Sequence, residues 1–175
     1  MENIVLILLI MVMLLSVGQA YLAPEASGRP YAMAASGQDP RCPPTAAEPL
    51  GPFYEPGAPE RSKVGQGYLL RGTVMSSGDC RPISRAQIEF WLAGPNGQYD
   101  DAHRATVFSD TAGGYRFESN FPPRYSFRPP HIHLRVSAAG FHTLVTQHYP
   151  VAGHTEGNFD LVLAPEGEGP PKAVK

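Results

Sequence analysis

Short segments in which hydrophobic and polar residues alternate recur along the middle of the chain. In residues 87–92, for example, Ile88, Phe90 and Leu92 fall on one face of an extended strand. Turn residues such as those of 110–114 separate these segments. The alternation predicts strands at residues 68–75, 87–92, 105–109, 115–118, 131–137, 144–149 and 158–163.

About seven short strands separated by turns, without a long helical period, predict an all-β fold. We expect an antiparallel β-sandwich of about seven or more strands, because short alternating strands must bury one face each against a second sheet. The 18 Gly and 19 Pro among 175 residues also favour a loop-rich β domain. One such domain, at residues 49–165, accounts for the strands.

The first residues differ from this pattern. Residues 4–15 are an unbroken apolar run, and the small residues Gly18 and Ala20 follow it, which is typical of a signal peptide comprising residues 1–20. A run of about 12 residues is short for a membrane span, which needs about 20. No Lys or Arg precedes the run, so an uncleaved anchor is the alternative. We therefore expect export to the periplasm or the cell exterior, and no large membrane region beyond this segment.

Residues 21–48 are rich in Pro, Ala and Gly and lack hydrophobic periodicity, which predicts a loop-rich arm before the domain. Residues 166–175 have a similar character and are expected to form a flexible tail. The chain has two cysteines, Cys42 and Cys80, and in an exported protein such a pair predicts one disulfide. The alternative is two unrelated thiols, one buried and one exposed.

The charge distribution argues against a nucleic-acid partner. The net charge is -2, and the chain has no run of like charges. The oligomeric state is left open by the sequence.

Two histidines alternate with apolar residues at the start of the segment 131–137. If Ile132 and Leu134 face the core, His131 and His133 project from the opposite face, about 6.5 Å apart along the backbone. Two imidazoles at this spacing can converge on one metal ion. By itself, however, the pair is also typical of a solvated strand face.

The other available donors decide which metal is plausible. Residues 121–140 contain no Cys, Asp or Glu, and the candidate donors are Tyr99 and Tyr125. Two imidazoles with two phenolates favour a hard, highly charged ion, so Fe(III) suits this set better than Zn(II) or Cu(I). A trivalent ion would also favour loss of the proton from phenols whose ordinary pKa is about 10. The alternative for each tyrosine is a half-buried position in a sandwich strand or corner.

Several motifs of the chain match one known family. They include Gly51-Pro52-Phe53-Tyr54, Cys80-Arg81-Pro82-Ile83 and Thr146-Gln147, and the most specific is Tyr-x-x-Arg-x-x-His-x-His at residues 125–133. Together they resemble the intradiol ring-cleavage dioxygenases, the family of protocatechuate 3,4-dioxygenase and catechol 1,2-dioxygenase. The resemblance extends from about residue 50 to residue 149, nearly the whole expected domain.

The resemblance implies a non-haem Fe(III) centre. Tyr99 and His131 would be its equatorial ligands, and Tyr125 and His133 its axial ligands. A catechol-type diol would chelate the iron and displace Tyr125, which can accept one of the two protons that the diol loses. O2 would then be inserted between the two hydroxyl-bearing carbons, and the product would be a muconate-type diacid.

The resemblance also implies roles for four residues that do not bind iron. Arg128 would stabilise negative charge on the substrate, and Gln147 would be a polar residue of the same pocket. Pro52 and Tyr54 would line the mouth where the substrate enters. The usual small residue and Asp after the tryptophan strand are replaced by Ala93-Gly94, and this departure, among others, indicates a small exported member of the family.

Two other functions compete with ring cleavage. Residues 72–74 and 110–117 would suit a non-catalytic, transthyretin-like β-sandwich binding module equally well, and a fold alone does not determine function. The second alternative is an iron- or catecholate-binding protein without turnover, which would have the same four iron ligands. The set of four ligands with Arg128 distinguishes the enzyme from the binding module, because such a module has no use for it.

Overall fold

Two β-sheets face each other in the part of the chain that the structure, a computed structural model, describes: residues 42–170 and 173. The expected signal or anchor segment, residues 1–20, lies outside the described residues, as do arm residues 21–41 and tail residues 171, 172, 174 and 175. The described elements are β1 (Tyr68–Ser76), β2 (Gln87–Leu92), the 3₁₀ turn η1 (Asp101–His103), β3 (Arg104–Phe108), β4 (Gly114–Ser119), β5 (Ile132–Ser137), β6 (Leu144–His148), β7 (Glu156–Asn158) and β8 (Leu161–Leu163). None of the helical structure in the described residues is long and apolar enough to cross a membrane.

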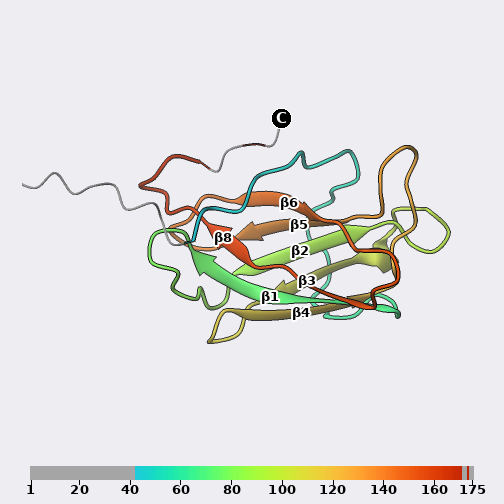
Figure 1. The fold of residues 1–175 in the computed structure, drawn as a ribbon, viewed down its shortest axis with the longest axis horizontal. Coiled ribbons are helices and arrows are strands. Elements are labelled where there is room, and N and C mark those ends of the chain that lie inside the picture. Colours follow the sequence, from blue (N-terminus) through green and yellow to red (C-terminus); the bar gives the residue numbers. More distant parts are fainter. Residues whose placement is uncertain (1–41, 171–172, 174–175) are drawn as a thin grey trace, which may run out of the picture. The chain divides into compact units, whose positions relative to one another are not determined.

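The first sheet is antiparallel throughout, with the strand order β3-β2-β5-β6. In the second sheet β1 pairs antiparallel with β4 and parallel with both β7 and β8. The predicted all-β sandwich is confirmed, with the qualification that its second sheet is mixed. The turn at residues 109–113 connects β3 of one sheet to β4 of the other (Figure 1).

Residues 158–163, predicted as one strand, form parts of two strands. The parallel pairing with β1 is interrupted at Phe159 and Asp160 and resumes at β8. The Asp160 carboxylate accepts a hydrogen bond from the Thr73 backbone N–H at 2.8 Å. The Phe159 carbonyl lies so close to Gly72 that any side chain at Gly72 would collide with it. The break is therefore made by contacts with a strand that lies far away in the sequence.

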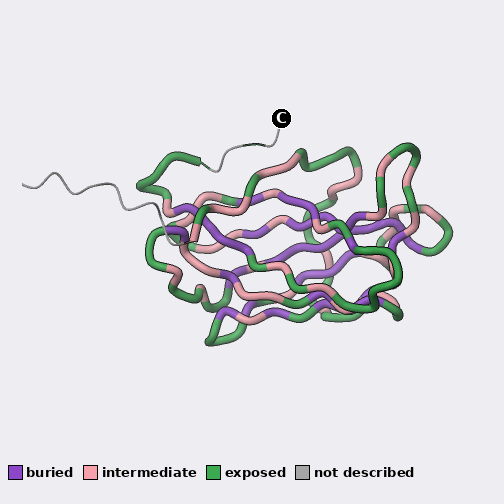
Figure 2. The backbone as a smooth tube through the Cα atoms, in the orientation of Figure 1, coloured by how far each residue is buried: buried purple, intermediate pink, exposed green. Residues whose placement is uncertain are grey.

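The core lies between the sheets and follows the alternation in the sequence. Ile88, Phe90 and Leu92 of β2 are buried in it, as the pattern of residues 87–92 predicts. Phe90 stacks on Phe117 of β4 with a centroid distance of 4.1 Å and so connects the two sheets. Buried positions follow the strands, whereas exposed positions lie mainly in the connections (Figure 2).

The outer face of the first sheet is crossed by residues 42–61, so the arm predicted at residues 21–48 continues to residue 61, and from here on the arm means residues 42–61. At β6 the Glu48 N–H donates to the Val145 carbonyl at 2.8 Å. At the far strand, β3, the Thr106 N–H donates to the Pro59 carbonyl at 2.8 Å. The arm therefore passes over this face from one edge strand to the other.

The disulfide predicted from the sequence is present between Cys42 and Cys80. It joins the first described residue of the arm to the turn between β1 and β2. The alternative of two unrelated thiols is excluded.

Candidate metal centre

The four predicted iron ligands line one cavity of about 260 Å³. Tyr99 comes from the loop after β2, and Tyr125 comes from the loop between β4 and β5. His131 directly precedes β5 and His133 lies within it. The imidazole centroids are 4.8 Å apart, the two phenol rings are 5.5 Å apart, and the Tyr99 hydroxyl lies 3.1 Å from Nε2 of His131.

The contacts of His131 leave one ring nitrogen free to bind a metal. Nδ1 lies 2.7 Å from the Pro129 carbonyl oxygen, which can only accept a hydrogen bond, so Nδ1 carries the proton. Nε2, which lies 3.1 Å from the Tyr99 hydroxyl, then carries the lone pair that a metal would bind. A ligand histidine commonly donates its other N–H to a carbonyl in this way, because the contact orients the ring. Burial lowers the pKa of His131, which favours the neutral form that a metal needs.

His133 is buried on the outer face of the sheet. Its imidazole stacks on Trp91 at 4.8 Å, and its Nδ1 is buried without a hydrogen-bond partner among the described residues. Burial, reinforced by nearby His131 and Arg128, lowers the pKa of His133 to about 3. Both histidines are only 3% exposed, so the solvated strand face is not what the structure shows.

The donor set suits a hard trivalent cation better than a soft divalent one. Burial, together with the neighbouring Tyr125, raises the pKa of the Tyr99 phenol to about 12, so a strongly charged cation is needed to ionise it at neutral pH. In the described part of the chain, no three His, Cys, Asp or Glu side chains gather as a metal site. Two neutral imidazoles and two phenol oxygens therefore fit Fe(III).

Arg128 also lines the cavity, and neighbouring polar side chains orient it. Its Nη2 donates to Oε1 of Gln147 at 2.8 Å and to the Tyr149 hydroxyl at 3.1 Å. Gln147 is the cross-strand partner of His133 in β6. The sequence identified Gln147 through its motif, whereas Tyr149, three residues beyond Thr146 in the same strand region, was missed.

Of the two residues expected to line the substrate mouth, only one lies at the cavity. Pro52 lines the cavity with Phe53, but Tyr54 does not line it. The Tyr54 hydroxyl instead donates to the carboxylate of Glu89 at 3.1 and 3.2 Å. Pro52 and Phe53 form a turn that places both residues at the cavity, and Tyr54 after the turn contacts the sheet instead. No signal in the sequence distinguished Phe53 from Tyr54.

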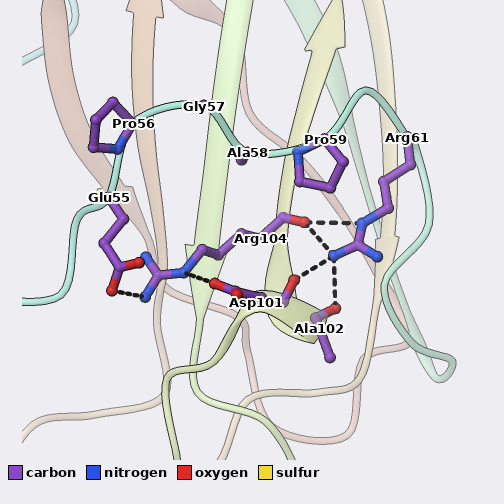
Figure 3. Close-up of a pocket in the computed structure, with 9 residues that line it drawn as sticks. All are labelled: Glu55, Pro56, Gly57, Ala58, Pro59, Arg61, Asp101, Ala102 and Arg104. Carbon is purple, nitrogen blue, oxygen red and sulfur yellow. Dashed lines mark hydrogen bonds and ion pairs between the residues drawn. The ribbon is translucent and has the colours of Figure 1, made fainter.

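Phe53 packs against both tyrosines of the donor set. It stacks on Tyr99 with a centroid distance of 4.4 Å and meets Tyr125 edge-on at 5.3 Å. Its backbone carbonyl accepts a hydrogen bond from the buried guanidinium of Arg104, which also bonds to Glu55 at 2.8 Å (the pair with Glu55 is drawn in Figure 3).

Two buried charged residues of the sheet thus hold the arm beside the cavity. Arg104 contacts residues 53 and 55, whereas Glu89 accepts from Tyr54 between them. Glu89 is 3% exposed and is also paired with Arg135 at 2.7 Å. The position of residues 53–55 beside the cavity therefore depends on polar side chains from β2, β3 and β5.

A second and larger cavity, of about 630 Å³, lies under residues 55–61 of the arm (Figure 3). None of the predicted site residues lines it. Its arginines are engaged within the protein: Arg61 donates to the backbone carbonyls of Asp101, Ala102 and Arg104, and Arg104 pairs with Glu55. The smaller cavity is therefore the candidate site.

The chain departs from the family's usual pattern at Ala93-Gly94, and this departure has a local structural explanation. Gly94 lies against the His103 ring so closely that a side chain at Gly94 would overlap it. His103 contacts the Asp100 carboxylate at 2.7 Å, directly after Tyr99. The small residue therefore permits the packing of the turn that follows a predicted ligand.

Comparisons with known proteins identify ring-cleaving dioxygenases as similar proteins. The catechol 1,2-dioxygenase of Candida albicans is 30% identical, covering 60% of this chain and 46% of its own. The hydroxyquinol 1,2-dioxygenase of Rhodococcus opacus is 32% identical, covering 59% and 45%. The chain spans about half the length of the curated relatives it matches. No protein-family model matches the chain.

Among solved structures, the dioxygenase domain of a dioxygenase–carbohydrate-binding protein fusion from Streptomyces sp. SirexAA-E is 27% identical. Its TM-score is 0.63, and the match covers 70% of this chain and 99% of that one. The sequence relatives and the fold point to the same family as the motifs at residues 51–54 and 125–133. The chain is therefore similar to the intradiol ring-cleavage dioxygenases in sequence and in fold.

Proposed function

We propose that the chain is a non-haem Fe(III) dioxygenase that cleaves a catechol-type diol between its two hydroxyl-bearing carbons. The observation that carries the proposal is the convergence of two imidazoles and two phenols on one cavity, with Arg128 beside them. Both atoms of O2 would enter the product, a muconate-type diacid. A ferric ion held by these four side chains would bind the diol oxygens and withdraw electron density from the ring, which makes the ring reactive towards O2.

The residues around the cavity would each have a separate role in the proposed reaction. Tyr125 would hold, at its phenol oxygen, one of the two protons that the diol releases. Arg128, oriented by Gln147 and Tyr149, would stabilise the negative charge that develops on the substrate. Phe53 would exclude water from the two tyrosines on which it packs, and a drier site strengthens the action of Arg128.

The test uses the full chain produced with iron. Ferric phenolate absorbs visible light by charge transfer, so the purified protein should be red to purple and contain about one iron per chain. Incubation with catechol should consume O2 and give a muconate-type diacid, identified by mass. A double variant, Tyr99→Phe with Tyr125→Phe, serves as the control and should be colourless.

Other outcomes would identify the rival functions. A coloured protein that consumes no O2 with any of a panel of catechols and hydroxyquinols would be an iron- or catecholate-binding protein. A colourless protein without iron after iron-replete production would be a binding module, and the ligand assignment would be wrong.

We also propose that the protein is exported. The apolar segment at residues 4–15 and the Cys42–Cys80 disulfide support this, because disulfides persist mainly in oxidising compartments. Mass determination of the protein from cell fractions would show cleavage after Ala20 or a retained anchor. Recovery of the uncleaved protein from the reducing cytoplasm alone would contradict the proposal.

A further inference from the structure

A tight turn beside the cavity carries a large apolar side chain at its tip. The Arg128 N–H donates to the Tyr125 carbonyl at 2.8 Å, which leaves Ser126 and Phe127 at the two central positions of the turn. Ser126 adopts a left-handed φ of 54°. Central turn positions of this kind usually carry Gly, Asn or Asp, because these residues tolerate the backbone conformation and favour water.

Phe127 does not contribute to the folded core. It is 84% exposed, more than any other large hydrophobic side chain in the described part of the chain. An exposed ring gains almost no hydrophobic stabilisation, since that depends on the apolar area removed from water. Yet Phe127 lines the same cavity as the four ligands. Its ring is therefore placed where a bound molecule, and not the protein, could cover it.

Two more exposed side chains are neighbours of residues that line the cavity, although they do not line it themselves. Leu50, 37% exposed, precedes the lining residue Gly51, and Tyr149, 38% exposed, bonds to the lining residue Arg128. We call Leu50, Phe127 and Tyr149 the apolar rim. The rim holds three of the five large hydrophobic side chains exposed among the described residues: Leu50, Phe108, Phe127, Tyr149 and Val151. Exposed apolar surface gathered at a cavity is typical of a binding site.

We propose that the apolar rim binds a hydrophobic substituent of the diol, so that the preferred substrates are catechols with an aromatic or similarly bulky apolar group. This inference rests on the proposed function, whose substrate class it narrows. The predicted ligands His131 and His133 are buried, whereas Phe127, which lines the same cavity, is exposed, so Phe127 lies on the solvent side of these ligands. We infer that a group on the ring of a bound diol that extends towards solvent would meet Phe127.

The cavity is small, with a volume of about 260 Å³ against the range of about 300–1,000 Å³ that is usual for small-molecule sites. Phe127 belongs to its lining and is also exposed, so a second ring on the catechol that lies against Phe127 would cover apolar surface that the protein leaves open. Contact between two aromatic rings adds affinity beyond the area that it buries.

The experiment compares kcat/KM for 4-phenylcatechol and for catechol, measured by O2 uptake. The wild type should prefer 4-phenylcatechol. In Phe127→Ala the ratio of the two values should fall about 2- to 12-fold, mainly through KM, because one aromatic contact is lost. Phe127→Tyr should retain the wild-type ratio. Phe108→Ala, which removes an exposed aromatic ring that does not line this cavity, should also retain it.

Three results would overturn the inference while leaving the proposed function in place. The first is a wild type that cleaves catechol but not 4-phenylcatechol, and the second is an unchanged ratio in Phe127→Ala. The third is an equal fall of the ratio in Phe108→Ala. A Phe127→Ala variant that changes only its oligomeric state in size-exclusion chromatography would assign the rim to contact with another copy of the chain.

Binding without turnover separates the two proposals. Dissociation constants for both diols can be measured without O2, from the change in visible absorption of the iron-loaded protein. Tighter binding of 4-phenylcatechol, lost in Phe127→Ala but with no O2 uptake by the wild type, would support the rim and refute the proposed enzymatic function. Equal binding of the two diols would overturn the inference directly.

Discussion

Removing the disulfide between Cys42 and Cys80 should destabilise the protein strongly. The two residues are 38 positions apart, and on the chain-entropy model the closure of such a loop contributes about 4 kcal/mol to the free energy of unfolding. The arm keeps other contacts, including the hydrogen bond from the Thr45 N–H to the Val162 carbonyl at 3.0 Å. We therefore expect the folded state to persist with its melting temperature lowered by roughly 10–20 °C.

The assay compares urea and thermal unfolding of the metal-free wild type, with and without a phosphine reductant. The double variant Cys42→Ala with Cys80→Ala should unfold like the reduced wild type and should not respond to the reductant. Iron content and colour are measured on the variant without reductant, because a reductant would also act on Fe(III). The contacts of Glu89 and Arg104 with residues 53–55 remain in the variant and keep the arm over the cavity, so the variant should keep its iron and its colour at room temperature.

Two results would refute this reasoning. The first is a free energy of unfolding that differs by less than about 1 kcal/mol between the oxidised and the reduced wild type. The hydrogen bonds of the arm alone would then hold it in place. Loss of colour in the double variant while the sandwich remains folded would mean that the disulfide is required to form the metal centre.

Other predictions concern single side chains. Arg128→Ala should keep its iron and colour while kcat falls about 10²- to 10³-fold, as measured by O2 uptake. If the variant kept full activity, another residue would stabilise the negative charge on the substrate. Tyr99→Phe should lose one phenolate and shift the visible absorption band. Tyr54→Phe leaves the buried Glu89 carboxylate without one donor, and we expect a loss of about 1–2 kcal/mol in urea unfolding and a higher KM for the diol. Burial lowers the pKa of His148 to about 4, so between pH 6.5 and 4 the unfolded chain binds a proton that the folded chain does not. Stability should therefore fall as the pH falls through this window, by about 2 kcal/mol allowing for partial exposure, and urea unfolding of His148→Gln should show a smaller fall.

The strands and the core could be predicted because both follow local alternation. Residues 87–92 and 131–137 carry a period of two that any pleated strand obeys, and the structure places their apolar positions in the core. The same alternation put His131 and His133 on the face opposite the core. Their assignment as ligands of Fe(III) needed the motifs as well, because alternation says nothing about which distant tyrosines meet them.

The features that could not be predicted depend on contacts between distant segments. The break at Phe159 arises from its approach to Gly72 and from the hydrogen bond that the Tyr115 hydroxyl donates to its carbonyl at 2.6 Å. Within residues 158–163 the alternation itself shows no interruption. Likewise, the motif at residues 51–54 named Tyr54 without its orientation, which is set by Glu89, a residue 35 positions away.

The two predicted histidine ligands lie on the outer face of a sheet and not in the core, and this placement links the arm to the proposed chemistry. An imidazole on such a face would ordinarily be solvated, and burial is the largest cause that lowers the pKa of both His131 and His133. The chain that crosses this face is the arm, and Glu89 and Arg104 hold it next to the cavity. Because the neutral state of the histidines and the dryness of the cavity both depend on that cover, substitutions that release the arm should weaken iron binding even though no ligand is changed.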